Sequence, residues 1–171
     1  MEKTNKCLLE WNAIVEALGQ GKQSILVRNY QNTLKEFILY PTDVYLENEN
    51  YMDSFQNKHQ SFVEKNSEPK KDEPEYEIKY YATVEEEIEK PADGVNDLDE
   101  YHIWTNDHVQ SYINSDTTFF WLLRVYKLKE PIMATRTNGM VYANLDESIS
   151  LDGIEPVLSD AEFDKLKESL K

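Results

Sequence analysis

The sequence predicts an α+β fold, with a mixed, largely antiparallel sheet and three to four packed helices. Segments rich in β-branched and aromatic residues, typical of strands, occur together with segments in which apolar residues recur every three to four positions, as in helices. The chain has 171 residues, of which 40% are hydrophobic. We therefore expect a single domain, 1–171, with a sizeable core.

The first half of the chain is expected to supply two helices and two strands. Apolar residues at helical spacing, ended by Gly19, predict a helix over 8–18. The segments 24–30 and 36–40 are rich in strand-forming residues and are joined by a polar turn, which favours a hairpin. Aromatic residues that recur every three to four positions predict a second helix over 49–65.

The middle of the chain is more strongly charged. A stretch broken by two prolines, 66–74, predicts an exposed loop, and a strand is expected over 76–84. The acidic segment 85–99 contains both proline and glycine, and we expect most of it to be solvated loop. Thr105 is a suitable N-cap for a short helix that continues through Ile113.

The last third contains the clearest local signals. Residues 118–128 are almost continuously apolar, which is typical of a central strand covered on both faces. An Asn-Gly pair at 138–139 indicates a turn before a strand over 140–145. Ser159 and Glu162 have the spacing of a capping box, so a final helix is expected to begin there.

Cysteine content and hydropathy limit the compartment. The single cysteine, Cys7, excludes an intrachain disulfide, and its apolar neighbours favour a small buried side chain over a reactive thiol. Residues 1–7 lack the apolar run of a signal peptide, and the longest apolar stretch, 119–123, is far too short to span a membrane. We therefore expect a cytoplasmic protein without a membrane partner.

The positive charges are unevenly placed in a chain whose formal net charge is −15. Residues 20–40 hold three cations and one acid, and residues 122–138 hold four cations and one acid. All three arginines, Arg28, Arg124 and Arg136, lie in these two segments. A uniformly acidic surface would repel phosphates, so the two basic segments are the candidate contacts for an anionic ligand.

Both basic segments contain a Leu-x-Arg-x-Tyr pattern, which ends at Tyr30 and at Tyr126. Alternate residues of a strand share one face, so each arginine would lie on a partly covered sheet surface, where it needs a partner. One interpretation is an ion pair with a carboxylate such as Glu10 or Glu16, which would only order the core. The other is an anion-binding groove for phosphate or nucleic acid, with stacking tyrosines. The expected groove residues are Arg28, Arg124, Lys22, Lys127, Arg136, Tyr30 and Tyr126.

An alternative function is a Mg²⁺-dependent nuclease. Glu77 and Lys79 lie two positions apart on an expected strand. Asp43 or Asp53 would supply an upstream acid, so that carboxylates hold the metal and the lysine positions water. The same spacing is expected by chance in so charged a chain, and alternating charge is typical of a solvent-facing strand.

Other catalytic and metal-binding motifs are absent from the sequence. The three histidines, His59, His102 and His108, do not have the spacing of a zinc site. The chain has only five glycines, and no phosphate-binding loop or dinucleotide-binding fingerprint is present. We expect no metal, no cofactor and no catalytic residue.

Several blocks, taken in order, resemble the family called domain of unknown function 1802 (DUF1802). The blocks span nearly the whole chain: 9–11, 16–23, 26–28, 37–42, 102–105, 122–128 and 156–163. The resemblance implies no established activity, but some members resemble parts of restriction–modification systems, which implies a nucleic-acid context. After Pro41-Thr42 the family tends to carry an aromatic residue and a His-Gln pair. Here residues 43–46 are Asp-Val-Tyr-Leu, so the chain has no histidine at that position, and a function that depends on it is not expected here. The run 21–28 also faintly resembles small RNA-binding barrels related to pseudouridine-synthase accessory domains.

We favour a non-catalytic binding module in a nucleic-acid-related or restriction/defence-related setting, which binds an anionic ligand through a basic sheet surface. The nuclease that uses Glu77 and Lys79 is the alternative enzyme. A third interpretation is an acidic protein-interaction module with a basic protein partner, although charged loops usually serve solubility.

Overall fold

The computed structural model describes residues 2–170 and shows an eight-stranded mixed sheet with four α-helices, which confirms the predicted α+β class. The strands are β1 (Lys3–Trp11), β2 (Ile25–Arg28), β3 (Glu36–Thr42), β4 (Lys71–Asp72), β5 (Glu75–Pro91), β6 (Thr117–Ala134), β7 (Tyr142–Ser150) and β8 (Glu155–Pro156). The helices are α1 (Asn12–Gly19), α2 (Gln60–Asn66), α3 (Asn106–Ile113) and α4 (Asp160–Ser169). Short 3-10 segments are η1 (Val44–Glu47), η2 (Tyr51–Ser54), η3 (Asn57–His59) and η4 (Ala92–Tyr101).

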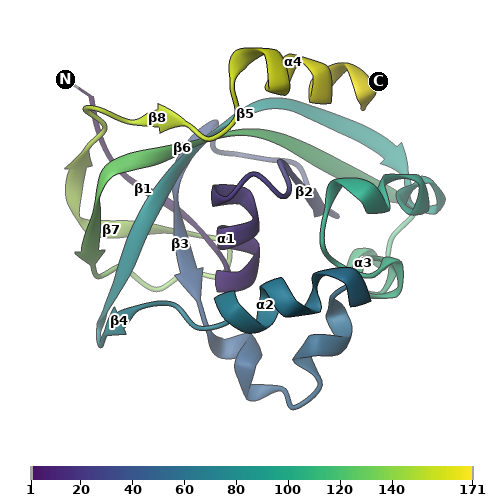
Figure 1. Ribbon diagram of the computed structural model, residues 1–171, viewed down its shortest axis with the longest axis horizontal. Coiled ribbons are helices and arrows are strands. Elements are labelled where there is room, and N and C mark those ends of the chain that lie inside the picture. Colours follow the sequence, from purple (N-terminus) through teal and green to yellow (C-terminus); the bar gives the residue numbers. More distant parts are fainter. Residues whose placement is uncertain (1, 171) are drawn as a thin grey trace.

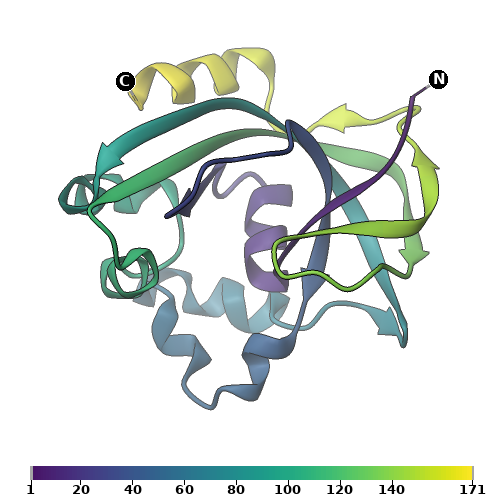
Figure 2. The ribbon, with the colours of Figure 1, turned by 180° about the vertical axis from the view of Figure 1, so that it is seen from behind.

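The main sheet has the order β2-β6-β5-β3-β1-β7, with β4 added to β5 and β8 to β6. Only β1 and β3 pair in parallel, and the other strand pairs are antiparallel. The strand expected over 118–128 lies within β6, which has neighbours on both sides and is therefore internal. The sheet curls around α1 (Figures 1 and 2).

The core lies on both faces of this curled sheet. Seven consecutive residues of α1, 12–18, are buried, as expected for a helix enclosed on all sides. Along β3 the buried side chains alternate between the cluster around α1 and a second cluster on the other face. Cys7 belongs to the second cluster and is fully buried, which confirms the structural interpretation, and burial raises the pKa of its thiol to about 11.

The predicted N-terminal helix is correct over residues 12–18, which belong to α1, but it begins too early, and the predicted hairpin is wrong. Residues 8–11, expected to be helical, belong to β1, because residues 7–11 pair in parallel with 38–42 of β3. The strands β2 and β3 both exist, but they do not pair with each other: β2 pairs with β6, and β3 lies between β1 and β5. Because β3 buries side chains on both faces, an internal position is more favourable for it than one in an isolated hairpin.

Two other segments also differ from the prediction. The helix expected over 49–65 is replaced by η2, η3 and the shorter α2, because Phe55 is extended and its backbone bridges to Trp104. The acidic loop expected over 85–99 is partly strand, since β5 continues to Pro91 in register with β6.

Both predicted caps are confirmed. The Thr105 side chain accepts a hydrogen bond from the backbone N–H of His108 at the start of α3. Ser159 and Glu162 form the predicted capping box of α4, which packs on the outside of the sheet over β5 and β6 (Figure 1). Within residues 2–170, no helix has the length and apolarity needed to cross a membrane.

Candidate functional site

The Arg28 guanidinium group on β2 forms an ion pair with the Glu10 carboxylate on β1. Both side chains are only 8% exposed. The Arg28 Nη1 atom also donates a hydrogen bond to the carbonyl oxygen of Val27 at 3.1 Å. The second carboxylate oxygen of Glu10 accepts a hydrogen bond from the backbone N–H of Trp11 at 2.9 Å. The charges of this buried pair are therefore mutually compensated.

Arg124 lies in a different part of the molecule. On β6, it donates to the carbonyl oxygen of Leu158 and to the carboxylate of Asp160, both at 2.9 Å, at the start of α4. In the ladder between β2 and β6, Arg28 is opposite Phe119, five positions before Arg124. Five residues of an antiparallel strand span about 17 Å. The two arginines therefore do not share one groove.

A cavity with a volume of about 390 Å³ lies among the described residues. It lies where β1 and β3 end, and β2, α3 and residues 136–141 complete its walls. Of the seven expected anion-binding residues, the cavity is lined by Arg28, Tyr30 and Arg136. The other four, Arg124, Lys22, Lys127 and Tyr126, do not line it. Anion binding itself remains a prediction for all seven.

Aromatic side chains form much of the cavity wall. Two of the three tryptophans, Trp11 and Trp104, line it together with Tyr30, His108 and Tyr112. The Trp11 ring stacks on Tyr45, with ring centroids 4.7 Å apart and planes 4° apart, and lies 5.4 Å from the ring of His108. This packing fixes the orientation of the Trp11 ring, so the cavity offers a preformed aromatic surface.

The electrostatics of the cavity differ from those of the whole chain. Among the described side chains, the lining contains two of the three arginines but a single acidic residue, Glu10. Burial lowers the pKa of His108, and the Glu10 charge raises it by less, so the imidazole is neutral at pH 7. Among the described residues, Arg136 has no carboxylate within ion-pair distance, and its guanidinium group lies 5.3 Å from the ring of Tyr40. The cavity therefore carries a net positive charge.

The rim of the cavity is apolar. Val44, Tyr112 and Met140 have exposed fractions of 68%, 42% and 96%, and they are the large hydrophobic residues exposed within the described part of the chain. All three line this one cavity. Exposed apolar side chains that cluster around a concave site mark a binding surface more often than isolated ones do.

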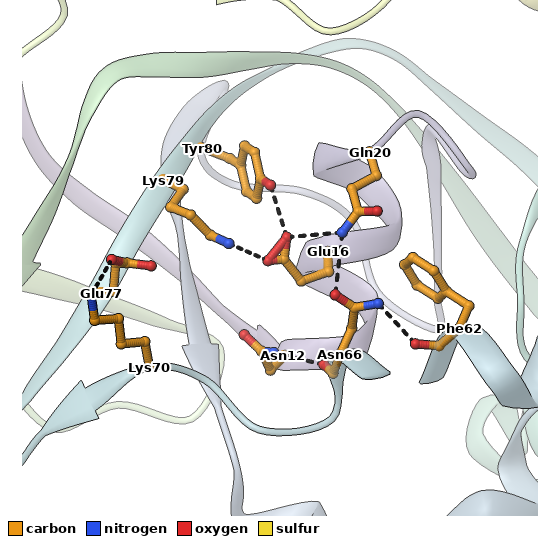
Figure 3. A network of polar contacts seen from close by, with 9 residues as sticks. All are labelled: Asn12, Glu16, Gln20, Phe62, Asn66, Lys70, Glu77, Lys79 and Tyr80. Carbon is orange, nitrogen blue, oxygen red and sulfur yellow. Dashed lines mark hydrogen bonds and ion pairs between the residues drawn. The ribbon is translucent and has the colours of Figure 1, made fainter. Parts of the chain in front are cut away.

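Glu77 and Lys79, the candidate nuclease pair, are each engaged in other contacts. The Lys79 ammonium group donates to Glu16 at 2.5 Å, and the same carboxylate accepts the Tyr80 hydroxyl at 2.8 Å (Figure 3). Glu77 lies 3.8 Å from the ammonium group of Lys70. This network ties α1 to β5, which is a structural role.

The acids that would complete a metal site are not gathered around this pair. Asp43 accepts hydrogen bonds from Lys71 and from the Tyr76 hydroxyl, at 2.5 and 3.1 Å. Among the side chains that the structure describes, no three from His, Cys, Asp or Glu are grouped so that they could hold a metal ion. The geometry therefore favours the cavity over the nuclease pair as the functional site.

Sequence reasoning missed most of the aromatic wall. Trp11 falls within the predicted helix over 8–18, and Trp104 enters only through the family resemblance over 102–105. His108 is considered only as a metal ligand. His108 and Tyr112 are four positions apart on α3 and therefore share one helix face. That spacing, next to Trp104, was the available signal.

Comparisons with known proteins identify a family and align the chain with solved structures at low sequence identity. The sequence matches the family described as Domain of unknown function (DUF1802) over residues 7–169. No curated protein matches the chain. The crystal structure of ASCH from Zymomonas mobilis aligns with a TM-score of 0.46 and 13% sequence identity, over 95% of this chain and 93% of that chain. A mutant of the same protein aligns with a TM-score of 0.48 and 13% identity, over 96% of this chain and 94% of that chain.

Proposed function

The chain belongs to the DUF1802 family, and from this premise we propose that it is a non-catalytic binding module for a nucleotide, whose base enters the aromatic cavity and whose phosphate meets Arg136. Family members that resemble parts of restriction–modification systems suggest a nucleic-acid-related or defence-related setting for such a ligand.

The observation that carries this proposal is the combination of aromatic wall and positive charge in one cavity. Its volume of about 390 Å³ is within the range of sites for small ligands. Trp11, Trp104 and Tyr30 line the cavity, and every nucleobase has a face that can stack on an aromatic ring. Arg136, which lacks a carboxylate partner among the described residues, supplies a cation for a phosphate.

An aromatic cavity can also bind a methylated ammonium group through cation–π contacts. Such a ligand is favoured where the lining carries net negative charge. Here Glu10, the only acid of the lining, is neutralised by Arg28, and Arg136 adds a further positive charge. The electrostatics therefore favour an anion over a cation.

The test is a calorimetric titration with the 5′-monophosphates of adenosine, guanosine, cytidine and uridine, with inorganic phosphate as a separate probe. At least one nucleotide should bind, and more tightly than phosphate alone, because stacking adds to the charge contact. Arg136→Gln should weaken binding about tenfold, as expected for loss of a charge-assisted contact. Lys129→Gln makes the same charge change at an exposed residue outside the cavity and should leave the affinity unchanged.

Two results would refute the proposal. One is the absence of binding to all four nucleotides at millimolar concentration. The other is an equal loss of affinity in Arg136→Gln and Lys129→Gln, which would show that general charge, rather than the cavity, attracts the ligand.

A further inference from the structure

Resting on the proposed function, we propose that the natural ligand is a short segment of single-stranded nucleic acid. One base would enter the cavity, and the next base would lie on the apolar rim formed by Val44, Tyr112 and Met140. The cavity alone would fit either a free nucleotide or one nucleotide of a strand. The apolar rim favours the strand.

The exposure of the rim is the first argument. Met140 is 96% exposed, so a base confined to the cavity would leave most of the apolar surface of Met140 in water. A second base that continues outward from the cavity would cover Met140 and the exposed part of Tyr112. Covering such a patch is favourable because apolar surface leaves water.

The chemistry of the rim is the second argument. Tyr112 has a planar ring for stacking, and methionine is flexible and polarisable, so it adapts to faces of different shape. Neither side chain reads the hydrogen-bonding edge of a particular base. The rim therefore fits a neighbouring base of any identity, as in sequence-tolerant contacts to single strands.

Charge complementarity favours a nucleic acid over a peptide. A basic peptide would need free carboxylates near the cavity, but Glu10, the only acid in the lining, is paired with Arg28. A phosphodiester between the two bases would instead find the cation of Arg136, which also lines the cavity. An anionic backbone that carries planar groups matches both features.

The acidity of the chain limits how long the bound segment can be. The formal net charge is −15, so phosphates beyond the cavity would face a repulsive surface. We therefore expect about one phosphate contact, with a slope of log K against log salt of about −0.7. Affinity should reach its maximum with a short oligonucleotide.

The experiment compares adenosine 5′-monophosphate with adenylate oligonucleotides of two, four and eight residues, as RNA and as DNA. The dinucleotide should bind roughly 5- to 150-fold more tightly than the mononucleotide, which is the gain expected from one stacked base. The octamer offers more positions at which the same short segment can bind. After this statistical factor is divided out, its affinity should exceed that of the tetramer by no more than about threefold. Met140→Ser should abolish the advantage of the dinucleotide over the mononucleotide, whereas Met140→Leu, which keeps the apolar surface, should preserve it.

The outcomes separate this inference from the proposed function. If the mononucleotide binds and the dinucleotide binds no more tightly, the strand inference is overturned and nucleotide binding stands. If no nucleotide of any length binds, both are overturned. An affinity that rises steadily with length up to eight residues would show that the bound segment is not short, because such a rise requires several phosphate contacts.

Discussion

The Arg28 guanidinium group on β2 is paired with the Glu10 carboxylate on β1, although these strands are not neighbours in the sheet. β2 is one edge of the main sheet, and β1 is next to the opposite edge. The ion pair therefore connects the two sides of the curled sheet beside the aromatic cavity, and Arg28 also lies over the rings of Trp121 and Tyr112, at 5.6 and 5.9 Å.

Removing one partner of this pair should destabilise the protein. In Glu10→Gln the buried Arg28 charge loses its compensation, and breaking such a pair costs about 3–5 kcal/mol. Chemical denaturation at pH 7 measures this loss. Adding Arg28→Met removes the unpaired charge, so the double variant should recover part of the stability.

Asp160→Asn is the matched control for Glu10→Gln. It breaks the other arginine–carboxylate pair, but the Asp160 side chain is 91% exposed, and water screens the contact. The loss should be about 0–1 kcal/mol. A loss for Glu10→Gln as small as that of the control would contradict the role given to the buried pair.

Gly19→Ala should be destabilising because of steric overlap. A Cβ atom at Gly19 would lie 2.1 Å from the nearest atom of the Tyr80 ring, and the Tyr80 hydroxyl is held by Glu16. Overpacking of this kind costs about 1–3 kcal/mol. Thermal or chemical denaturation would show the loss. If overlap with the Tyr80 ring is the cause, Gly19→Ala should lower the free energy of unfolding much less in a Tyr80→Leu background. An equal loss of stability in both backgrounds would exclude overlap as the cause.

Stability should fall below pH 6.5 because of His102. Burial lowers the pKa of this histidine from 6.5 to about 4, so between these values the unfolded chain binds a proton that the folded protein does not. The contribution is fully present above pH 6.5 and is lost as the pH falls towards 4, by on the order of 3 kcal/mol. The free energy of unfolding, measured from pH 7.5 to 4.5, should fall less steeply in His102→Leu. Parallel curves would show that other groups cause the decline.

The protein should bind single-stranded oligonucleotides without cleaving them in the presence of Mg²⁺. Lys79 is held by Glu16, and Glu77 lies beside Lys70, so the two side chains are not arranged around a metal position. Gel analysis of a labelled oligonucleotide with Mg²⁺ or with a chelator tests this. Metal-dependent cleavage that disappears in Lys79→Gln would support the enzyme instead.

Local sequence signals determined the parts of the fold that depend on neighbouring residues. The Ser159 capping box and the Thr105 cap are correct because a side chain satisfies a backbone N–H three positions away, which requires no distant partner. The apolar run in β6 identified an internal strand, because a strand that is apolar on both faces is stable only where both faces are buried. The sequence also predicted that Arg28 needs a carboxylate partner, because the residue was expected on a partly covered strand face. Glu10 was one of the two partners considered.

Only the tertiary structure decided which strands pair and which residues meet at the cavity. Strand-forming residues look alike whatever their partner, so the sequence could not distinguish a hairpin of 24–30 with 36–40 from the observed pairs of β2 with β6 and of β3 with β1 and β5. The same pairing separated Arg28 from Arg124 and brought Trp11, Trp104 and His108 together from distant positions. The composition of this chain sets its fold class and its scarce positive charge, and long-range strand pairing decides where that charge and the aromatic rings form a site.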